Sequence, residues 1–97
     1  MKIRELLSDA SKWCSINYAK NKEGQDTDVR SADAVCWCLE GAIRHCYEIY
    51  EYAVVSQKLT KASYKLFPKR SIALSVFNDD PLTTFEDIQQ LVTFADV

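Results

Sequence analysis

Residues 31–53 read SADAVCWCLEGAIRHCYEIYEYA and carry the longest helical pattern in the chain. Their apolar residues recur at spacings of three and four, which is the period of a helix with one buried face. Ser31 is a favourable N-cap, and Asp33 stands in the first turn, where the helix dipole favours an acid. We therefore predict a helix that begins after Ser31. Its buried stripe contains Val35, Cys38, Leu39, Ala42, Cys46, Ile49 and Ala53.

Trp37 and Gly41 lie on roughly the opposite side of this predicted helix, because consecutive helical residues are about 100° apart. A helix with apolar or small residues on two sides is usually central in its domain. Glycine inside a helix costs about 1 kcal/mol relative to alanine. Gly41 therefore predicts the close approach of another element.

Two further segments, residues 2–13 and 57–67, show the same helical periodicity. Pro68 marks the end of the second segment, because the residue before a proline is disfavoured in helical conformation. Residues 20–30 are polar, contain a glycine and lack periodicity, so they predict a loop.

The last third of the chain predicts short elements separated by a turn. Residues 71–77 are compatible with a one- or two-turn helix, which we prefer, or with a short strand. Residues 78–81 predict a turn, and Thr84 with Asp87 has the spacing of a capping box at the start of a last helix. The predicted fold class is mainly α, an irregular bundle of about four helices that can include one short extended segment, in a single domain of residues 1–97.

Composition favours a small binding module. The chain has 97 residues, of which 47% are hydrophobic and 27% charged, which is a globular composition. A chain of this length is too short to form a large core. Residues 1–5 carry charges where a secretory leader needs an apolar stretch, and no apolar run reaches the ~20 residues that span a bilayer. We expect a cytoplasmic protein that does not interact with a membrane.

The four cysteines and His45 are the candidate metal-binding or catalytic side chains. Cys36-x-Cys38 lacks the two-residue spacing of structural zinc pairs, and its thiols diverge on a helix. Cys38, His45 and Cys46 share one side of the predicted helix, but that side is also its apolar face. We therefore predict packed, reduced thiols, no metal, no cofactor and no catalysis. A cysteine enzyme that depends on His45 is a less favoured alternative.

The pair Asn78-Asp79 has two interpretations. The side chains can present hydrogen-bonding groups to a ligand, or they can satisfy nearby backbone amides and close the start of the last helix. We favour the structural interpretation. Among the tyrosines of residues 47–52, we expect Tyr50 to lie in the core and leave Tyr47 open between core and interface.

The charge distribution is uneven. Residues 57–70 contain five basic residues and no acid, whereas residues 78–97 contain five acids and no base. The basic stripe is either a solvated helix face or a docking surface with aromatic anchors, which protein interfaces prefer. The candidate partner-binding residues are Lys58, Lys61, Tyr64, Lys65, Phe67, Pro68, Lys69 and Arg70.

Two blocks of the sequence stand out: Ser31-x-x-Ala34-Val35-x-Trp37-Cys38-x-x-Gly41-Ala42, preceded by Trp13-Cys14, and Phe77-Asn78-Asp79-x-Pro81-x-x-Thr84-x-x-Asp87-Ile88. These blocks resemble a family of short, uncharacterised bacterial and phage proteins. The resemblance implies a shared fold and no known activity, and this chain departs from it with Phe77 in place of the usual tryptophan. It makes Trp37, Gly41, Asn78, Asp79 and Thr84 the structural motif residues.

A weaker resemblance, carried by chain length and the basic segment 66–70, is to the accessory proteins by which lambdoid phages modify the host RecBCD nuclease. It implies a DNA-repair nuclease as the larger partner. We thus expect a non-enzymatic adaptor, with a prolyl isomerase at Pro68 as a further partner class. The alternative is a nucleic-acid-binding protein that uses residues 57–70, although the mildly acidic chain and its single arginine in that segment favour it less.

Overall fold

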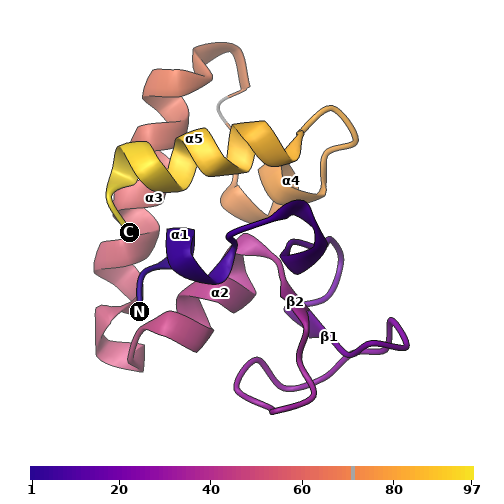
Figure 1. Ribbon diagram of the computed structural model, residues 1–97. Coiled ribbons are helices and arrows are strands. Elements are labelled where there is room, and N and C mark those ends of the chain that lie inside the picture. Colours follow the sequence, from indigo (N-terminus) through magenta and orange to yellow (C-terminus); the bar gives the residue numbers. More distant parts are fainter. Residues whose placement is uncertain (71) are drawn as a thin grey trace.

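The chain forms a group of helices beside a short pair of antiparallel strands (Figure 1). The computed structural model describes residues 1–70 and 72–97. Helices account for 55% of the chain, which confirms the predicted mainly α class. The helices are α1 (Ile3–Leu6), α2 (Leu39–Cys46), α3 (Tyr52–Leu66), α4 (Leu74–Asp79) and α5 (Phe85–Ala95). The strands are β1 (Ala19–Lys20) and β2 (Cys36–Trp37), and the 3-10 turns are η1 (Ala10–Lys12), η2 (Ile49–Glu51) and η3 (Pro68–Arg70).

The single helix predicted after Ser31 is wrong. Residues 36–37 instead form β2, which pairs with β1 so that Ala19 faces Trp37. The helix begins only at Leu39, where the Sγ atom of Cys38 accepts a hydrogen bond from the Gly41 N–H at 3.3 Å. The Oγ atom of Ser31 accepts from the Asp33 N–H at 3.1 Å and closes a local turn.

The close approach predicted at Gly41 is confirmed, although the approaching group is a backbone carbonyl and not a second helix. A Cβ atom at Gly41 would overlap the carbonyl oxygen of Tyr18 in the segment that leads into β1. Trp37 is buried, and its Nε1 atom donates to the Val29 carbonyl at 2.9 Å. Gly41 thus lets α2 lie directly against the extended segment.

The helix predicted over residues 2–13 is broken into α1 and η1. The backbone leaves helical geometry at Leu7, and Asp9 begins the 3-10 turn by accepting the Ser11 N–H at 2.9 Å. Ile3 and Leu7 are nevertheless buried, as the apolar spacing predicted. A short polar side chain at position 9 therefore interrupts the helix, and Ala10, which the helical spacing would bury, is exposed.

The helix predicted over residues 57–67 is confirmed and begins earlier, as α3 covers Tyr52–Leu66 and ends just before Phe67 and Pro68. The short helix preferred for residues 71–77 is also confirmed in α4, while residue 71 itself lies outside the described part of the chain. The predicted turn is displaced, because Asn78 and Asp79 complete α4. The turn closes where the Thr83 N–H donates to the Asp80 carbonyl at 2.9 Å.

The capping box of the last helix is confirmed. The Thr84 hydroxyl accepts from the Asp87 N–H at 3.2 Å, and the Asp87 carboxylate accepts from the Thr84 N–H at 3.0 Å. α5 then packs across α3, as Figure 1 shows. This crossing positions the outer faces of both helices beside each other.

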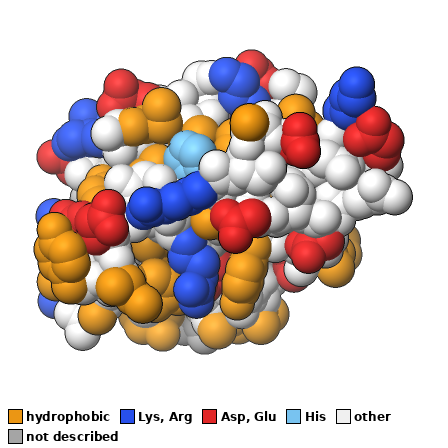
Figure 2. Space-filling view, turned by 90° about the horizontal axis from the view of Figure 1, so that it is seen from below, with side chains coloured by type: hydrophobic (Ala, Val, Ile, Leu, Met, Phe, Trp, Pro, Cys, Tyr) orange, Lys and Arg blue, Asp and Glu red, His pale blue; other side chains and the backbone are white. Residues whose placement is uncertain are grey.

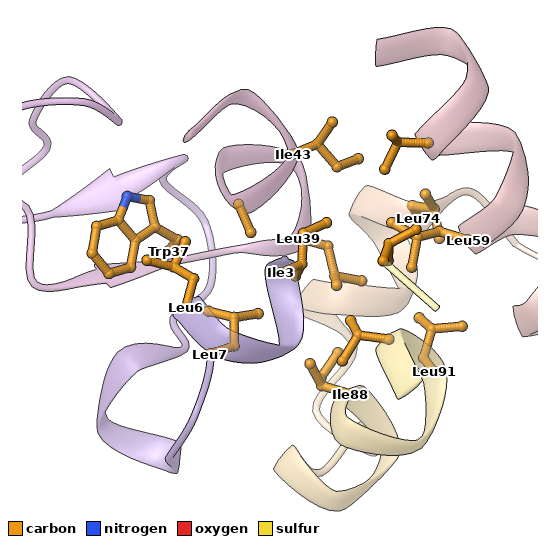
Figure 3. Close-up of a cluster of buried hydrophobic side chains, with 14 of the residues drawn as sticks. Ile3, Leu6, Leu7, Trp37, Leu39, Ile43, Leu59, Leu74, Ile88 and Leu91 are labelled. Atoms are coloured by element: carbon orange, nitrogen blue, oxygen red, sulfur yellow. The ribbon is translucent and has the colours of Figure 1, made fainter. Parts of the chain in front are cut away.

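All five helices and both strands contribute side chains to the core. Figure 3 shows side chains of α1 and α2 facing those of α3, α4 and α5, with Trp37 of β2 at one edge. The labelled members are Ile3, Leu6, Leu7, Trp37, Leu39, Ile43, Leu59, Leu74, Ile88 and Leu91. Among the described helices, none is long and apolar enough to cross a bilayer.

Candidate functional site

The outer face of α3 carries a row of lysines. Lys58, Lys61 and Lys65 are exposed and follow one another at spacings of three and four, which places them on one side of the helix. Tyr64 lies beside them with 47% of its surface exposed. The basic stripe predicted from the sequence is therefore continuous in space along α3.

Phe94 of α5 faces this row across a shallow groove of about 440 Å³. Phe94 is 54% exposed, although it is a large apolar side chain. The lining contains no acidic residue, so the floor is apolar and the rim is positively charged. We call this feature the lysine groove, and its residues are Lys58, Lys61, Ala62, Tyr64, Lys65, Phe94 and Ala95.

The lysines of the groove are electrostatically free. No salt bridge in the described part of the chain involves Lys58, Lys61 or Lys65. Long lysine side chains can lie along apolar surface while their ammonium groups stay in water. The groove can therefore contact an apolar side chain on its floor and carboxylates along its rim.

Arg70 is not part of the groove. Its guanidinium donates to the Asp80 carboxylate at 3.1 Å and to the Thr83 hydroxyl, and lies 3.8 Å from the Asp87 carboxylate. It also stacks 4.6 Å from the centre of the Phe77 ring. Arg70 thus connects η3 to the turn between α4 and α5, so its charge is balanced within the chain.

The remaining predicted contact residues lie beyond the end of α3. Phe67 is half-buried, with its ring 5.2 Å from that of Phe77. Pro68 and Lys69 are exposed in η3. The structure thus groups four of the eight predicted residues in the groove. Phe94 is not among the residues predicted from the sequence. The one sequence feature that could indicate it is its position, because it is an aromatic residue outside the buried stripe of its helix.

Asn78 forms a buried polar junction and is only 2% exposed. Its Oδ1 atom accepts from the Trp13 indole at 2.8 Å and from the Leu39 N–H at 3.0 Å. Its Nδ2 atom donates to the Cys14 carbonyl at 3.1 Å and to Asp79 Oδ1 at 2.9 Å. Asn78 therefore has a structural role, but its partners lie in the N-terminal segment and at the start of α2, and not at the start of the last helix as predicted.

Asp79 supports an unusual backbone position. Its Oδ1 atom accepts from the Ile16 N–H at 3.1 Å. Ile16 has a φ of 80°, a left-handed conformation that β-branched residues rarely adopt. Asp79 thus holds the loop before β1 against the end of α4, which is again a structural role.

His45 and the cysteines do not form a nucleophile–base pair. The Nδ1 atom of His45 donates to the Val29 carbonyl at 2.6 Å, and its ring lies 5.0 Å from Trp37. Burial raises the pKa of the Cys38 thiol and raises that of Cys46 to about 11. Reactivity belongs to the thiolate, so these environments disfavour nucleophilic chemistry. In the described part of the chain, no three Cys, His, Asp or Glu side chains are grouped to hold a metal.

The tyrosine-rich segment after α2 differs from the prediction. Tyr50 is 80% exposed in η2, so its expected core position is wrong. Tyr47 is half-buried and donates its hydroxyl to the Val97 carbonyl at 3.0 Å. The helix assumed for residues 31–53 would have placed Tyr50 inward, and the bend after Cys46 turns it outward.

A family of unknown function, DUF6197, matches residues 1–96. The chain belongs to this family. The matched residues of the DUF6197 region include both the lysine groove and the Asn78 junction. Membership confirms the expected kinship with proteins of no known activity, while the resemblance to phage accessory proteins stays a prediction. No curated protein and no solved structure matches the chain.

Proposed function

We propose that this protein is a non-enzymatic binding module that docks an acidic segment of a larger protein in the lysine groove. The observation that carries the proposal is the combination of three free lysines with two exposed aromatic rings, Tyr64 and Phe94, around one groove. Aromatic anchors surrounded by charge are the composition that protein interfaces favour.

The two parts of the groove have different tasks in this proposal. Exposed ion pairs contribute only about 0.2–1 kcal/mol each, so the lysines mainly select an acidic partner and speed its association. Tyr64 and Phe94 supply the apolar area whose removal from water gives most of the affinity. The partner segment therefore carries a bulky apolar residue flanked by acids.

Nucleic acid is the second candidate ligand, and the structure favours it less. Arg70, the arginine of the basic segment, is engaged by Asp80 and Asp87 and is unavailable to phosphate. The groove then offers lysines alone, without the bidentate phosphate contacts that arginine makes.

The more specific proposal is that the partner belongs to a host nuclease that processes DNA ends. It rests on the resemblance to lambdoid-phage accessory proteins described above. A prolyl isomerase that reads Pro68 is a separate partner class and does not involve the groove.

The double variant K61E/K65E tests the groove, with K12E/K22E as a control of equal charge change elsewhere on the surface. We expect purified RecBCD-type nuclease to bind the wild type and K12E/K22E alike, and K61E/K65E at least about tenfold more weakly. Equal binding of all three proteins would exclude the groove. If the nuclease binds none of them, the nuclease is the wrong partner, and capture from lysate with K61E/K65E as the negative control decides whether another protein uses the groove.

The same variants distinguish nucleic acid from protein. A generic DNA duplex is titrated at about 50 mM and about 200 mM salt, because phosphate binding weakens steeply over that range. We expect no salt-dependent binding that K61E/K65E removes. Observation of such binding would replace the protein-docking proposal with the nucleic-acid one.

A further inference from the structure

Arg44, in the last turn of α2, is held between two tyrosine rings. Its guanidinium carbon lies 5.0 Å from the centre of the Tyr18 ring and 5.1 Å from that of Tyr52. Tyr18 precedes β1 and Tyr52 begins α3, so two separate segments fix one side chain. Stacking of this kind orients the planar guanidinium before any ligand arrives.

The hydrogen-bond donors of Arg44 are uncommitted. Its Nε atom forms an ion pair with Glu40 Oε2 at 3.8 Å, a distance beyond hydrogen bonding, so the pair leaves the donors themselves open. The Glu40 oxygens instead accept from the Tyr52 hydroxyl at 2.6 and 2.5 Å. Burial, and then this hydrogen bond, raise the pKa of Tyr52 to about 12. The hydroxyl therefore keeps its proton at neutral pH and remains hydrogen-bonded to the Glu40 carboxylate. Within residues 1–70 and 72–97, the Arg44 guanidinium donates no hydrogen bond.

Arg44 also forms part of the wall of a pocket of about 470 Å³. The pocket combines an apolar part, with Ile49 88% exposed at its rim and Tyr47 half-buried beside it, with two arginines and one glutamate. Figure 2 views the molecule from the side of α2 and shows basic side chains lying between hydrophobic ones, with acidic groups beside them. The lining residues are Arg30, Ile43, Arg44, Tyr47, Glu48, Ile49 and Tyr52.

The second arginine has a different role. Arg30 donates to the carbonyls of Arg44 at 3.2 Å and Tyr47 at 3.1 Å, which terminate α2. It also forms an ion pair with Glu48 at 3.7 Å, similar in length to that of Arg44 with Glu40, so the two arginines differ in whether their donors are occupied. Arg44 is therefore the group in this pocket that keeps both an oriented guanidinium and open donors.

We propose that this pocket binds a small-molecule carboxylate with an apolar body. The carboxylate pairs with the Nη groups of Arg44, and the apolar body lies against Ile49 and the half-buried ring of Tyr47. A planar guanidinium matches a carboxylate through two parallel hydrogen bonds, and the pocket volume lies within the range of small-molecule sites. The proposal concerns a different face from the lysine groove and does not depend on it.

Octanoate is the probe, and octanamide, which keeps the apolar body and loses the charge, is its matched control. Titration calorimetry with the wild type is expected to show octanoate binding about tenfold or more tighter than octanamide. R44Q should lose that preference and R44K should retain only part of it, because lysine cannot make the bidentate contact. K22Q, outside the pocket, should bind like the wild type.

Ile49→Ser provides a test that does not depend on the stability of the Arg44 variants. Ile49 is 88% exposed, so its truncation leaves the fold intact while removing the apolar rim. We expect I49S to bind octanoate several-fold more weakly, with an unchanged circular dichroism spectrum. The proposal is overturned if octanoate at about 10 mM does not bind the wild type, if octanamide binds equally well, or if a folded R44Q or I49S protein retains full affinity.

Discussion

Asn78 joins three separate segments of the chain through one buried amide. Trp13, Leu39 and Cys14 each direct a polar group at it. Asn78 is only 2% exposed, so water cannot take the place of these partners. A buried polar group without a partner costs more than the hydrogen bond itself contributes. Asn78 therefore determines how the N-terminal segment, the start of α2 and α4 meet.

Replacing Asn78 with alanine is expected to lower the free energy of unfolding by about 2–4 kcal/mol, because it strands two donors and one acceptor. Urea denaturation followed by circular dichroism measures the change. Asn17→Ala removes an asparagine whose amide makes a single 3.3 Å bond to Asp26, so a loss within about 1 kcal/mol is expected there. Equal losses in the two variants would contradict the role assigned to Asn78.

Replacing Gly41 with alanine is expected to change the stability in the direction opposite to that predicted by helix propensity. Glycine to alanine inside a helix normally stabilises by about 1 kcal/mol. At Gly41 the new methyl group meets the Tyr18 carbonyl, so G41A should destabilise the protein by about 1–3 kcal/mol in thermal or urea unfolding. Gln89→Ala, at an exposed position of α5, should stay close to the wild type. A G41A protein more stable than the wild type would show that α2 and the Tyr18 backbone are farther apart.

The capping box of α5 makes a prediction at the level of one element. Thr84→Ala removes the side-chain acceptor of the Asp87 N–H, and a loss of about 1 kcal/mol in unfolding free energy is expected. Thr84→Ser keeps the hydroxyl and should retain most of that stability. Because the cap is lost, the alanine variant should also fray the start of α5. Amide exchange at Glu86 and Asp87 would report this fraying.

Sequence periodicity predicted the elements with long apolar patterns and missed those specified by tertiary contacts. α3 and α5 follow their patterns, and Thr84 was identified because its capping chemistry is local. β1 and β2 have two residues each, which is too short for a strand period to register. The N-cap of α2 is Cys38, whose thiol is not a usual capping group, whereas the hydroxyl of Ser31 has the capping chemistry that the sequence pattern favours.

The candidate site was predicted in part for the same reason. The lysine row is a property of one helix and can be read from residues 57–66 alone. Phe94 enters the groove only because α5 crosses α3, and the pocket at Arg44 requires Tyr18 and Tyr52 to meet from different segments. Arg70 was assigned to the surface because its partners, Asp80 and Asp87, are distant in sequence.

The two ends of the chain are fastened to each other, which affects the whole molecule. Val97 is 1% exposed in the core, and its carbonyl accepts from the Ile3 N–H at 2.5 Å. The Asp96 carboxylate binds Lys2 at 2.8 Å and Arg4 at 2.5 Å. These contacts close α1 against α5 and position the last residues beneath Tyr47.

This closure predicts a specific acid dependence. Hydrogen bonds from Lys2 and Arg4 lower the pKa of Asp96 from 3.8 to about 2. A depressed pKa stabilises the folded state above the unfolded value, and that contribution declines as pH falls from about 3.8 through about 2. Asp96→Asn keeps a residue that tolerates the left-handed backbone at φ 57° and removes the charge.

We therefore expect Asp96→Asn to be less stable than the wild type at pH 6, with a difference that shrinks toward pH 2, in urea titrations at several pH values. Lys22→Gln alters an exposed lysine that takes part in no salt bridge within the described residues, and it should show no such convergence. A stability difference that stayed constant with pH would show that the Asp96 contacts do not form in solution.

The positions of the two indoles determine what optical spectroscopy can detect in this protein. Trp13 reaches α4 through Asn78 and lies 6.3 Å from the Phe85 ring at the start of α5. Trp37 reaches the 21–35 loop through Val29, so neither ring lines the lysine groove, whose α5 residues are Phe94 and Ala95. Emission excited at the red edge, where tyrosine does not absorb, will respond when the strand-bearing half loosens and will not report contacts at the lysine groove directly, because no indole lines it. A fluorophore attached to an introduced cysteine near Phe94 would then give an independent signal, and the two colours would separate partner docking from unfolding within a single titration.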